Sequence, residues 1–293
     1  MNAHNHHDLL DRVTAIFCQA RESHDGQRCM VAPSPELRDR IRQDLAQLRD
    51  SATPLVSNLL RAQSATPPGF NDGLIYPGDF FPIGTPVHVV RSAAANRAPL
   101  RGTLRVIVVL VQFSDRAMGQ TQQHFEDLFF STGVLPNGSV KEYYREVTNG
   151  LIDIAGEVVG PFTLPQTLAT YAHGASGTGT DLPNARTMAL DAAQAADPTV
   201  NFAPYDNDGD GFVDAFIVVH AGPGAEVTGS HDDIWSHKWV LPSGPYNADG
   251  TKIYGYLTVP EDSKIGVCCH ELGHLLFGFP GNGECERLLL LCG

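Results

Sequence analysis

One apolar run predicts the centre of a β-sheet: Leu104-Arg105-Val106-Ile107-Val108-Val109-Leu110-Val111. The run is rich in β-branched residues and is apolar at successive positions, so a strand formed by it has two apolar faces. Such a strand is typical of the middle of a sheet that is covered on both sides. A membrane-spanning helix needs roughly 18 apolar residues in succession. No stretch of the chain reaches that length, and we expect no membrane span.

Around this run, helical and strand-like patterns alternate. Helices are expected at residues 121–130, 139–148 and 184–196, and strands at residues 151–159, 212–219 and 253–259, the last at a sheet edge. Alternation of this kind predicts an α/β or α+β layer fold with a mixed sheet.

The N-terminal part of the chain has a different character. Ser34 and Pro35 are a typical N-cap and first helical residue, and Leu37 begins an apolar helical face. Residues 64–98 are rich in proline and glycine and predict an extended connector. We therefore divide the chain into a mostly helical segment with its connector (1–100), a folded domain (101–280) and an atypical tail (281–293).

Composition excludes several classes of protein. The chain has 293 residues, with 20 Lys and Arg against 33 Asp and Glu, a formal net charge of −13. An acidic protein repels phosphate backbones, so we expect no nucleic-acid partner. With 42% hydrophobic and 18% charged residues the chain can bury a core. The start, from Met1 to Asp8, lacks the basic region of a standard secretory signal.

The most informative pentapeptide is His270-Glu271-Leu272-Gly273-His274. On a helix, His270 and His274 share one face, close enough to bind one Zn²⁺. Glu271 then lies beside the metal, where it can act as the general base that takes a proton from water. The alternative interpretation is a pair of hydrogen-bonded core histidines.

A second motif begins at Asp206 and reads Asp206-Asn207-Asp208-Gly209-Asp210-Gly211-Phe212-Val213-Asp214. Its carboxylates and the Phe212 carbonyl follow the spacing of the first half of a Ca²⁺ loop. The predicted calcium ligands are Asp206, Asp208, Asp210, Phe212 and Asp214. The twelfth position is Ile217 instead of Glu, and a strand follows, so we expect a structural calcium loop outside the EF-hand fold. A solvated acidic turn is the alternative.

Taken together, these motifs resemble the immune inhibitor A family of secreted bacterial zinc metallopeptidases. The resemblance runs from about Leu104 to Pro280 and includes the segments 111–115, 139–144, 218–222, 234–237 and 270–280. It implies a zincin-like metallopeptidase domain whose active-site helix carries the His-Glu-x-x-His motif. It also implies zinc on His270 and His274, Glu271 as general base, calcium on the Asp-rich loop, and protein or peptide substrates. By the same resemblance, residues 1–100 correspond to a pro-segment, and the protein is expected to be extracellular.

The resemblance ends after Pro280. The tail 281–293 does not match the family's acidic continuation, which holds a third metal ligand, and we expect a shortened or altered C-terminus. Glu284 and Glu286 are the nearest candidate replacements. The sequence therefore supports two hypotheses about function. One is a zinc-dependent endopeptidase, and the other is a catalytically impaired, calcium-stabilised remnant of such an enzyme. His220 and His237 occupy motif-like positions, but we interpret each as a hydrogen-bonded structural residue. The sequence leaves the oligomeric state open.

Overall fold

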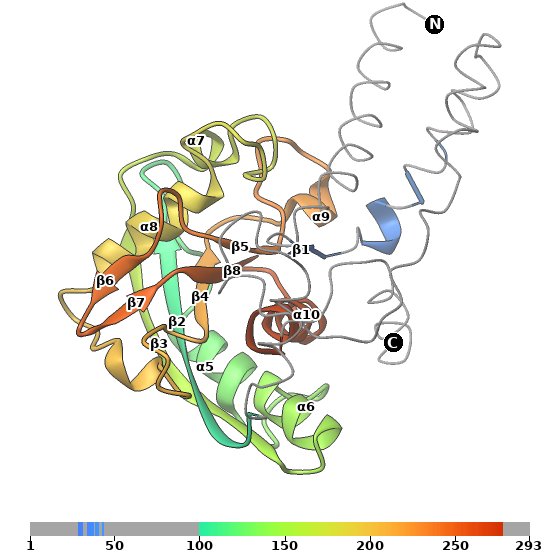
Figure 1. Ribbon diagram of the computed structural model, residues 1–293. Coiled ribbons are helices and arrows are strands. Elements are labelled where there is room, and N and C mark those ends of the chain that lie inside the picture. The colour runs from blue at the N-terminus through green and yellow to red at the C-terminus, as the bar shows by residue number, and fades with distance from the viewer. Residues whose placement is uncertain (1–28, 32–33, 38, 41–42, 44–99, 278–293) are drawn as a thin grey trace, which may run out of the picture.

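The computed structural model describes residues 29–31, 34–37, 39–40, 43 and 100–277, which form a mixed six-stranded sheet with helices on both faces (Figure 1). The strand order is β1-β5-β8-β4-β2-β3. The strands are β1 (Cys29–Met30), β2 (Gly102–Gln112), β3 (Ile152–Thr163), β4 (Phe216–His220), β5 (His237–Val240) and β8 (Gly255–Pro260). Strands β3, β2, β4 and β8 run parallel, and β5 and β1 are antiparallel to their neighbours.

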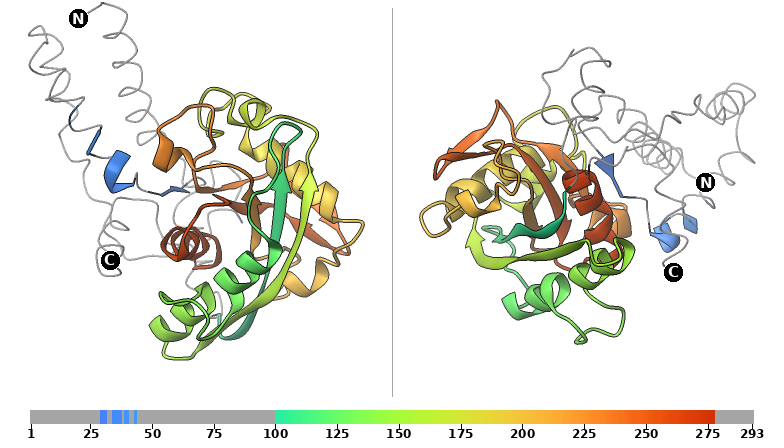
Figure 2. Two further views of the ribbon diagram at one scale, coloured as in Figure 1. Left: turned by 180° about the vertical axis from the view of Figure 1, so that it is seen from behind. Right: turned by 60° about the horizontal axis from the view of Figure 1, so that its bottom comes forward.

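Strand β2 is an interior strand of the sheet, as its sequence predicts, and lies between β4 and the edge strand β3. Ile107, Val109 and Val111 pack on one face with α7 (Leu168–Ala172) and α8 (Ala185–Ala196). Val106 and Val108 pack on the other face with α5 (Gln122–Phe130), α6 (Val140–Val147) and α10 (Ile265–Phe277). Figure 2 shows these two helical layers from behind and from below the first view. Burial on both faces explains why the run has no polar alternation.

The helices expected at residues 121–130, 139–148 and 184–196 each begin at a side chain that caps them. The Thr121 hydroxyl accepts a hydrogen bond from the His124 backbone N–H at the start of α5. Ser139 and Glu142 form a reciprocal capping box at the start of α6. Asn184 caps α8. Caps of this kind satisfy backbone N–H groups that have no partner inside the helix.

Two expectations about strands are wrong. The stretch 253–259 is not a sheet edge: β8 begins at Gly255 and lies between β5 and β4, while Ile253 ends a separate hairpin strand. The strand expected from residue 212 begins at Phe216. Val213 instead donates its backbone N–H to the Lys252 carbonyl. This contact ties the Asp-rich loop to the hairpin of β6 (Tyr246–Ala248) and β7 (Thr251–Ile253).

Little of the N-terminal segment is described. Residues 35–37 and 39–40 are helical, and Ser34 accepts a hydrogen bond from the Leu37 N–H at 3.2 Å, as the cap predicts. The rest of the predicted helical segment, the connector and the tail 281–293 lie outside the described residues. Within the described part, no helix has the length and apolar character needed to cross a membrane.

Candidate metal centre

Helix α10 brings the two motif histidines together. The Nε2 atoms of His270 and His274 are 3.1 Å apart, and the two rings meet edge to face with centroids 4.6 Å apart. Glu271 follows His270 directly, and its Oε1 lies 3.9 Å from the His270 Nε2. The three side chains that the sequence singled out therefore converge within one turn of the helix.

This cluster is buried. Glu271 is fully buried, the His274 residue is 3% exposed and the His270 side chain is 7% exposed. Both Glu271 carboxylate oxygens lack a hydrogen-bond partner among the described residues. A buried carboxylate is costly when hydrogen bonds do not replace its lost hydration.

Burial also shifts the pKa values of His270 and Glu271. It lowers the pKa of His270 to about 4, so this imidazole is neutral at pH 7 and keeps a lone pair. Burial raises the pKa of Glu271 well above its ordinary value, and the Glu226 carboxylate raises it further. The buried Lys238 opposes that rise because its positive charge favours the ionised carboxylate.

The residues present fit a zinc ion. Two nitrogen ligands at 2.0–2.1 Å from a tetrahedral metal are about 3.3 Å apart, close to the separation of the two Nε2 atoms. A hydrogen-bonded histidine pair accounts for the same distance but leaves the Glu271 oxygens unsatisfied. A cation between the imidazoles accounts for both. The candidates for a third ligand, Glu284 and Glu286, lie outside the described residues.

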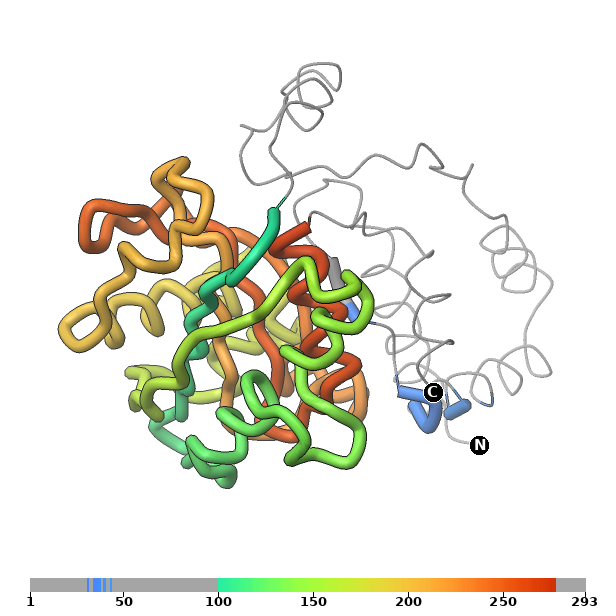
Figure 3. The backbone as a smooth tube through the Cα atoms, turned by 90° about the horizontal axis from the view of Figure 1, so that it is seen from below, coloured from blue at the N-terminus to red at the C-terminus, as the bar shows by residue number. Residues whose placement is uncertain are grey.

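Tyr144, whose contact no sequence motif indicated, connects α6 to α10. Its hydroxyl donates a 2.7 Å hydrogen bond to the Cys269 carbonyl, one residue before His270. Its ring packs against Phe277 at a centroid distance of 5.4 Å. Figure 3, viewed from below, shows the green α6 beside the red α10. The only sequence signal for this contact is an aromatic residue on the buried face of α6, which does not identify its partner.

The hydrogen bonds of the two lesser histidine candidates, His220 and His237, go to residues outside α10. His237 has both ring nitrogens in contact with partners, the Trp235 carbonyl at 2.6 Å and the Tyr256 hydroxyl at 2.9 Å. His220 is fully buried at the end of β4, with Nδ1 3.1 Å from the Ala221 carbonyl. The contacts of His237 are those of a structural histidine, whereas the buried Nε2 of His220 has no hydrogen-bond partner among the described residues.

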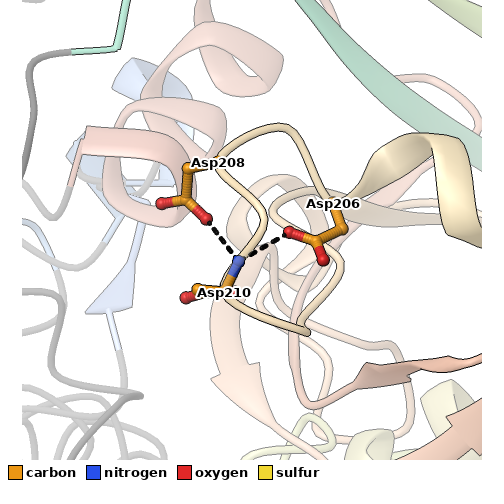
Figure 4. A group of neighbouring side chains, drawn as sticks. All are labelled: Asp206, Asp208 and Asp210. Carbon is orange, nitrogen blue, oxygen red and sulfur yellow. Dashed lines mark hydrogen bonds between the residues drawn. The ribbon is translucent and has the colours of Figure 1, made fainter.

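The Asp-rich loop lies at the start of β4, away from α10. Atoms of Asp206, Asp208 and Asp210 that could bind a metal lie within 4.8 Å of one another (Figure 4). Asp206 organises the loop: its Oδ1 accepts from the N–H groups of Gly209 and Asp210, and its Oδ2 accepts from the N–H of Gly211. The three carboxylates therefore lie close enough together for their oxygens, which are hard ligands, to bind one cation.

The other two predicted calcium ligands differ in position. Asp214 is 9% exposed, and its Oδ2 accepts hydrogen bonds from the backbone and side-chain N–H groups of Asn207. It is not among the three grouped carboxylates. Phe212 lies under Lys252, whose Nζ is 5.3 Å from the ring centroid. In the described loop the first three carboxylates therefore lie together, while Asp214 accepts hydrogen bonds from Asn207 of the same loop.

Comparison with known proteins identifies the family. The model of the immune inhibitor A peptidase M6 catalytic domain matches residues 101–285. The chain belongs to this family. It is 32% identical over 196 residues to the pre-pro-metalloprotease PrtV of Vibrio cholerae serotype O1, over 54% of this chain and 21% of that protein. It is 28% identical over 243 residues to Immune inhibitor A of Bacillus thuringiensis subsp. alesti, over 65% of this chain and 35% of that protein.

The match to the peptidase M6 catalytic domain coincides with the described fold. It begins beside β2 and extends past α10, so it includes both the buried histidine pair and the Asp-rich loop. The chain spans about a fifth to a third of the length of these relatives. Family membership supports a metallopeptidase domain and, with it, a bound metal.

Proposed function

We propose that this chain is the catalytic domain of a zinc-dependent endopeptidase that hydrolyses peptide bonds in proteins. One observation carries the proposal: a fully buried glutamate lies beside two imidazole nitrogens 3.1 Å apart in a member of the peptidase M6 family, and neither of its carboxylate oxygens has a hydrogen-bond partner of good geometry among the described residues. His270 and His274 would hold the metal. Glu271 would act as general base.

The role of each residue follows from its position. A zinc ion bound here would supply Lewis acidity and lower the pKa of water towards about 7. His270 stays neutral through burial and offers its Nε2 lone pair. Glu271, through an oxygen 3.9 Å from that nitrogen, would take the proton of the attacking water and pass it to the leaving amine. Burial raises the pKa of Glu271, and the positive charge of Lys238, together with that of a bound cation, would favour the ionised form that this role requires.

The test is the substitution Glu271→Gln, which keeps the shape of the side chain and removes the base. Hydrolysis of casein should fall to background while zinc per chain stays at the parent value. Glu146→Gln, at an exposed position of α6, is the matched control and should keep the parent rate. Equal turnover by the Glu271→Gln protein and the parent would reject the role of Glu271.

The second candidate is a catalytically impaired, calcium-stabilised member of the family. The tail favours it, because the match to the peptidase M6 catalytic domain ends at residue 285 and residues 286–293 lie beyond it. Zinc analysis of purified protein separates the candidates. One tightly bound zinc per chain without hydrolysis supports the impaired protein, and near-stoichiometric zinc with chelator-sensitive hydrolysis supports the peptidase.

We also propose that the Asp-rich loop binds a structural calcium ion and that residues 1–100 act as a pro-segment. The grouping of Asp206, Asp208 and Asp210 supports the first proposal. The second is supported by the pairing of β1 with β5, which places residues 29–30 along the edge of the sheet beside α10.

A further inference from the structure

A short piece of the chain lies on the sheet edge in an extended conformation. Strand β1 pairs antiparallel with β5, with Cys29 opposite Lys238 and Met30 opposite His237. The pairing continues at Val31, whose backbone N–H donates to the Ser236 carbonyl at 3.2 Å. The edge of β5 therefore binds main-chain groups of an added strand, the hydrogen-bonding mode of β-augmentation.

Val31 adds a side-chain contact to this pairing. It is 6% exposed and clusters with Leu37, Ala225 and Trp235, and Val267 of α10 packs against the same cluster. Trp235 also donates its indole N–H to the Val31 carbonyl at 2.8 Å. The backbone N–H and carbonyl of Val31 are thus both hydrogen-bonded, while its side chain is buried.

Hydrogen bonds hold Ser236, the residue of the main chain that pairs with Val31, in position. Glu226 accepts hydrogen bonds from the Ser236 hydroxyl at 2.5 Å and from the Ser236 N–H at 3.1 Å. This double contact orients the Ser236 carbonyl that receives the Val31 N–H. Val267 precedes His270 by one helical turn, so the surface that packs against Val31 lies on the same side of α10 as the histidine pair.

We propose that Ala225, Trp235 and Val267 form a side-chain subsite that selects aliphatic over charged residues in extended peptides bound along β5. Val31 occupies this subsite in the described chain. The proposal deepens the proposed peptidase function, since the subsite adjoins the candidate metal centre, but peptide binding is measurable without metal or turnover. Main-chain pairing supplies affinity for any extended peptide, whereas the subsite supplies the preference.

The test uses the full chain carrying Glu271→Gln, with and without Val31→Asp, and a fluorescent peptide with the sequence of residues 27–34 in which serine replaces cysteine. A charged side chain is poorly accommodated in the apolar cluster, so Val31→Asp should free the edge. We expect the Val31→Asp protein to bind the peptide about tenfold or more tightly than its parent, as measured by fluorescence anisotropy.

A matched peptide with aspartate in place of its valine tests the subsite itself. It should bind the Val31→Asp protein about tenfold or more weakly than the valine peptide, the change expected from losing one buried aliphatic side chain. Equal binding of the two peptides overturns the proposal, and so does equal affinity of parent and Val31→Asp protein for the valine peptide. Circular dichroism checks folding, and Val31→Ala replaces Val31→Asp if the latter unfolds the chain.

The outcomes separate this inference from the proposed function. If the peptides differ as expected but no variant with Glu271 hydrolyses casein, the subsite stands and the peptidase function fails. If casein is hydrolysed in a zinc-dependent way but the two peptides bind equally, the subsite alone is rejected.

Discussion

Replacing His220 by leucine should remove a large part of the acid sensitivity of this fold. His220 is fully buried at the end of β4, and its Nε2 has no hydrogen-bond partner among the described residues. Burial lowers its pKa from 6.5 to about 4. The unfolded chain therefore takes up a proton before the folded chain does, so the stability due to this difference is complete above about pH 6.5 and is lost as pH falls towards 4.

The size of the effect follows from the two pKa values. With 6.5 for the unfolded and about 4 for the folded chain, the free energy of unfolding falls by about 2 kcal/mol between pH 7 and pH 5. Urea unfolding at both pH values, at fixed zinc and calcium, measures it in parent and His220→Leu protein. Other titrating groups, including His270 and Glu226, are present in both proteins and largely cancel in the difference.

A matched control and a clear refutation are available. His124→Gln, at an exposed position on α5, should keep the pH dependence of the parent. If parent and His220→Leu protein lose stability equally between pH 7 and pH 5, His220 does not titrate as a buried neutral histidine, and the structural interpretation of this residue is wrong.

Two further predictions concern the candidate metal sites. Tyr144→Phe removes the donor to the Cys269 carbonyl, leaves that buried acceptor unsatisfied, and should lower the free energy of unfolding by about 1–3 kcal/mol in urea titrations; an unchanged value would show that α10 does not depend on this bond. Asp206→Asn should abolish most of the thermal stabilisation that calcium gives the parent, which is about 2.7 kcal/mol at 100 times the dissociation constant. The exposed Asp232→Asn should respond to calcium like the parent, and an equal response of the Asp206→Asn protein would contradict the calcium proposal.

The sequence predicted the features that depend on residues only a few positions apart. The β2 run identified a two-faced buried strand, and Ser139 and Asn184 marked helix starts, because burial on both faces and N-capping act over a few residues. The His-Glu-x-x-His spacing placed two imidazoles on one side of α10 because helical periodicity alone brings them there.

What sequence patterns missed depends on contacts between distant segments. Strand β5 is short, and it exists as a strand because β8 and β1 pair with it from either side. The late start of β4 follows from the hydrogen bond between Val213 and Lys252. Neither the partner of Tyr144 nor that of Val31 can be read from spacing, since each contact joins residues more than a hundred positions apart.

The two candidate metal sites place different demands on the fold. Asp206, Asp208 and Asp210 are half-buried or exposed, so water and backbone N–H groups can compensate their charges without an ion. Glu271 has no such alternative, because it is fully buried with no hydrogen-bond partner among the described residues. A carboxylate in that position is tolerated only if it takes up a proton or if nearby positive charge compensates it. Lys238 supplies part of that charge, and a cation between His270 and His274 would supply the rest. The energetic need for a cation is therefore greater at α10 than at the Asp-rich loop.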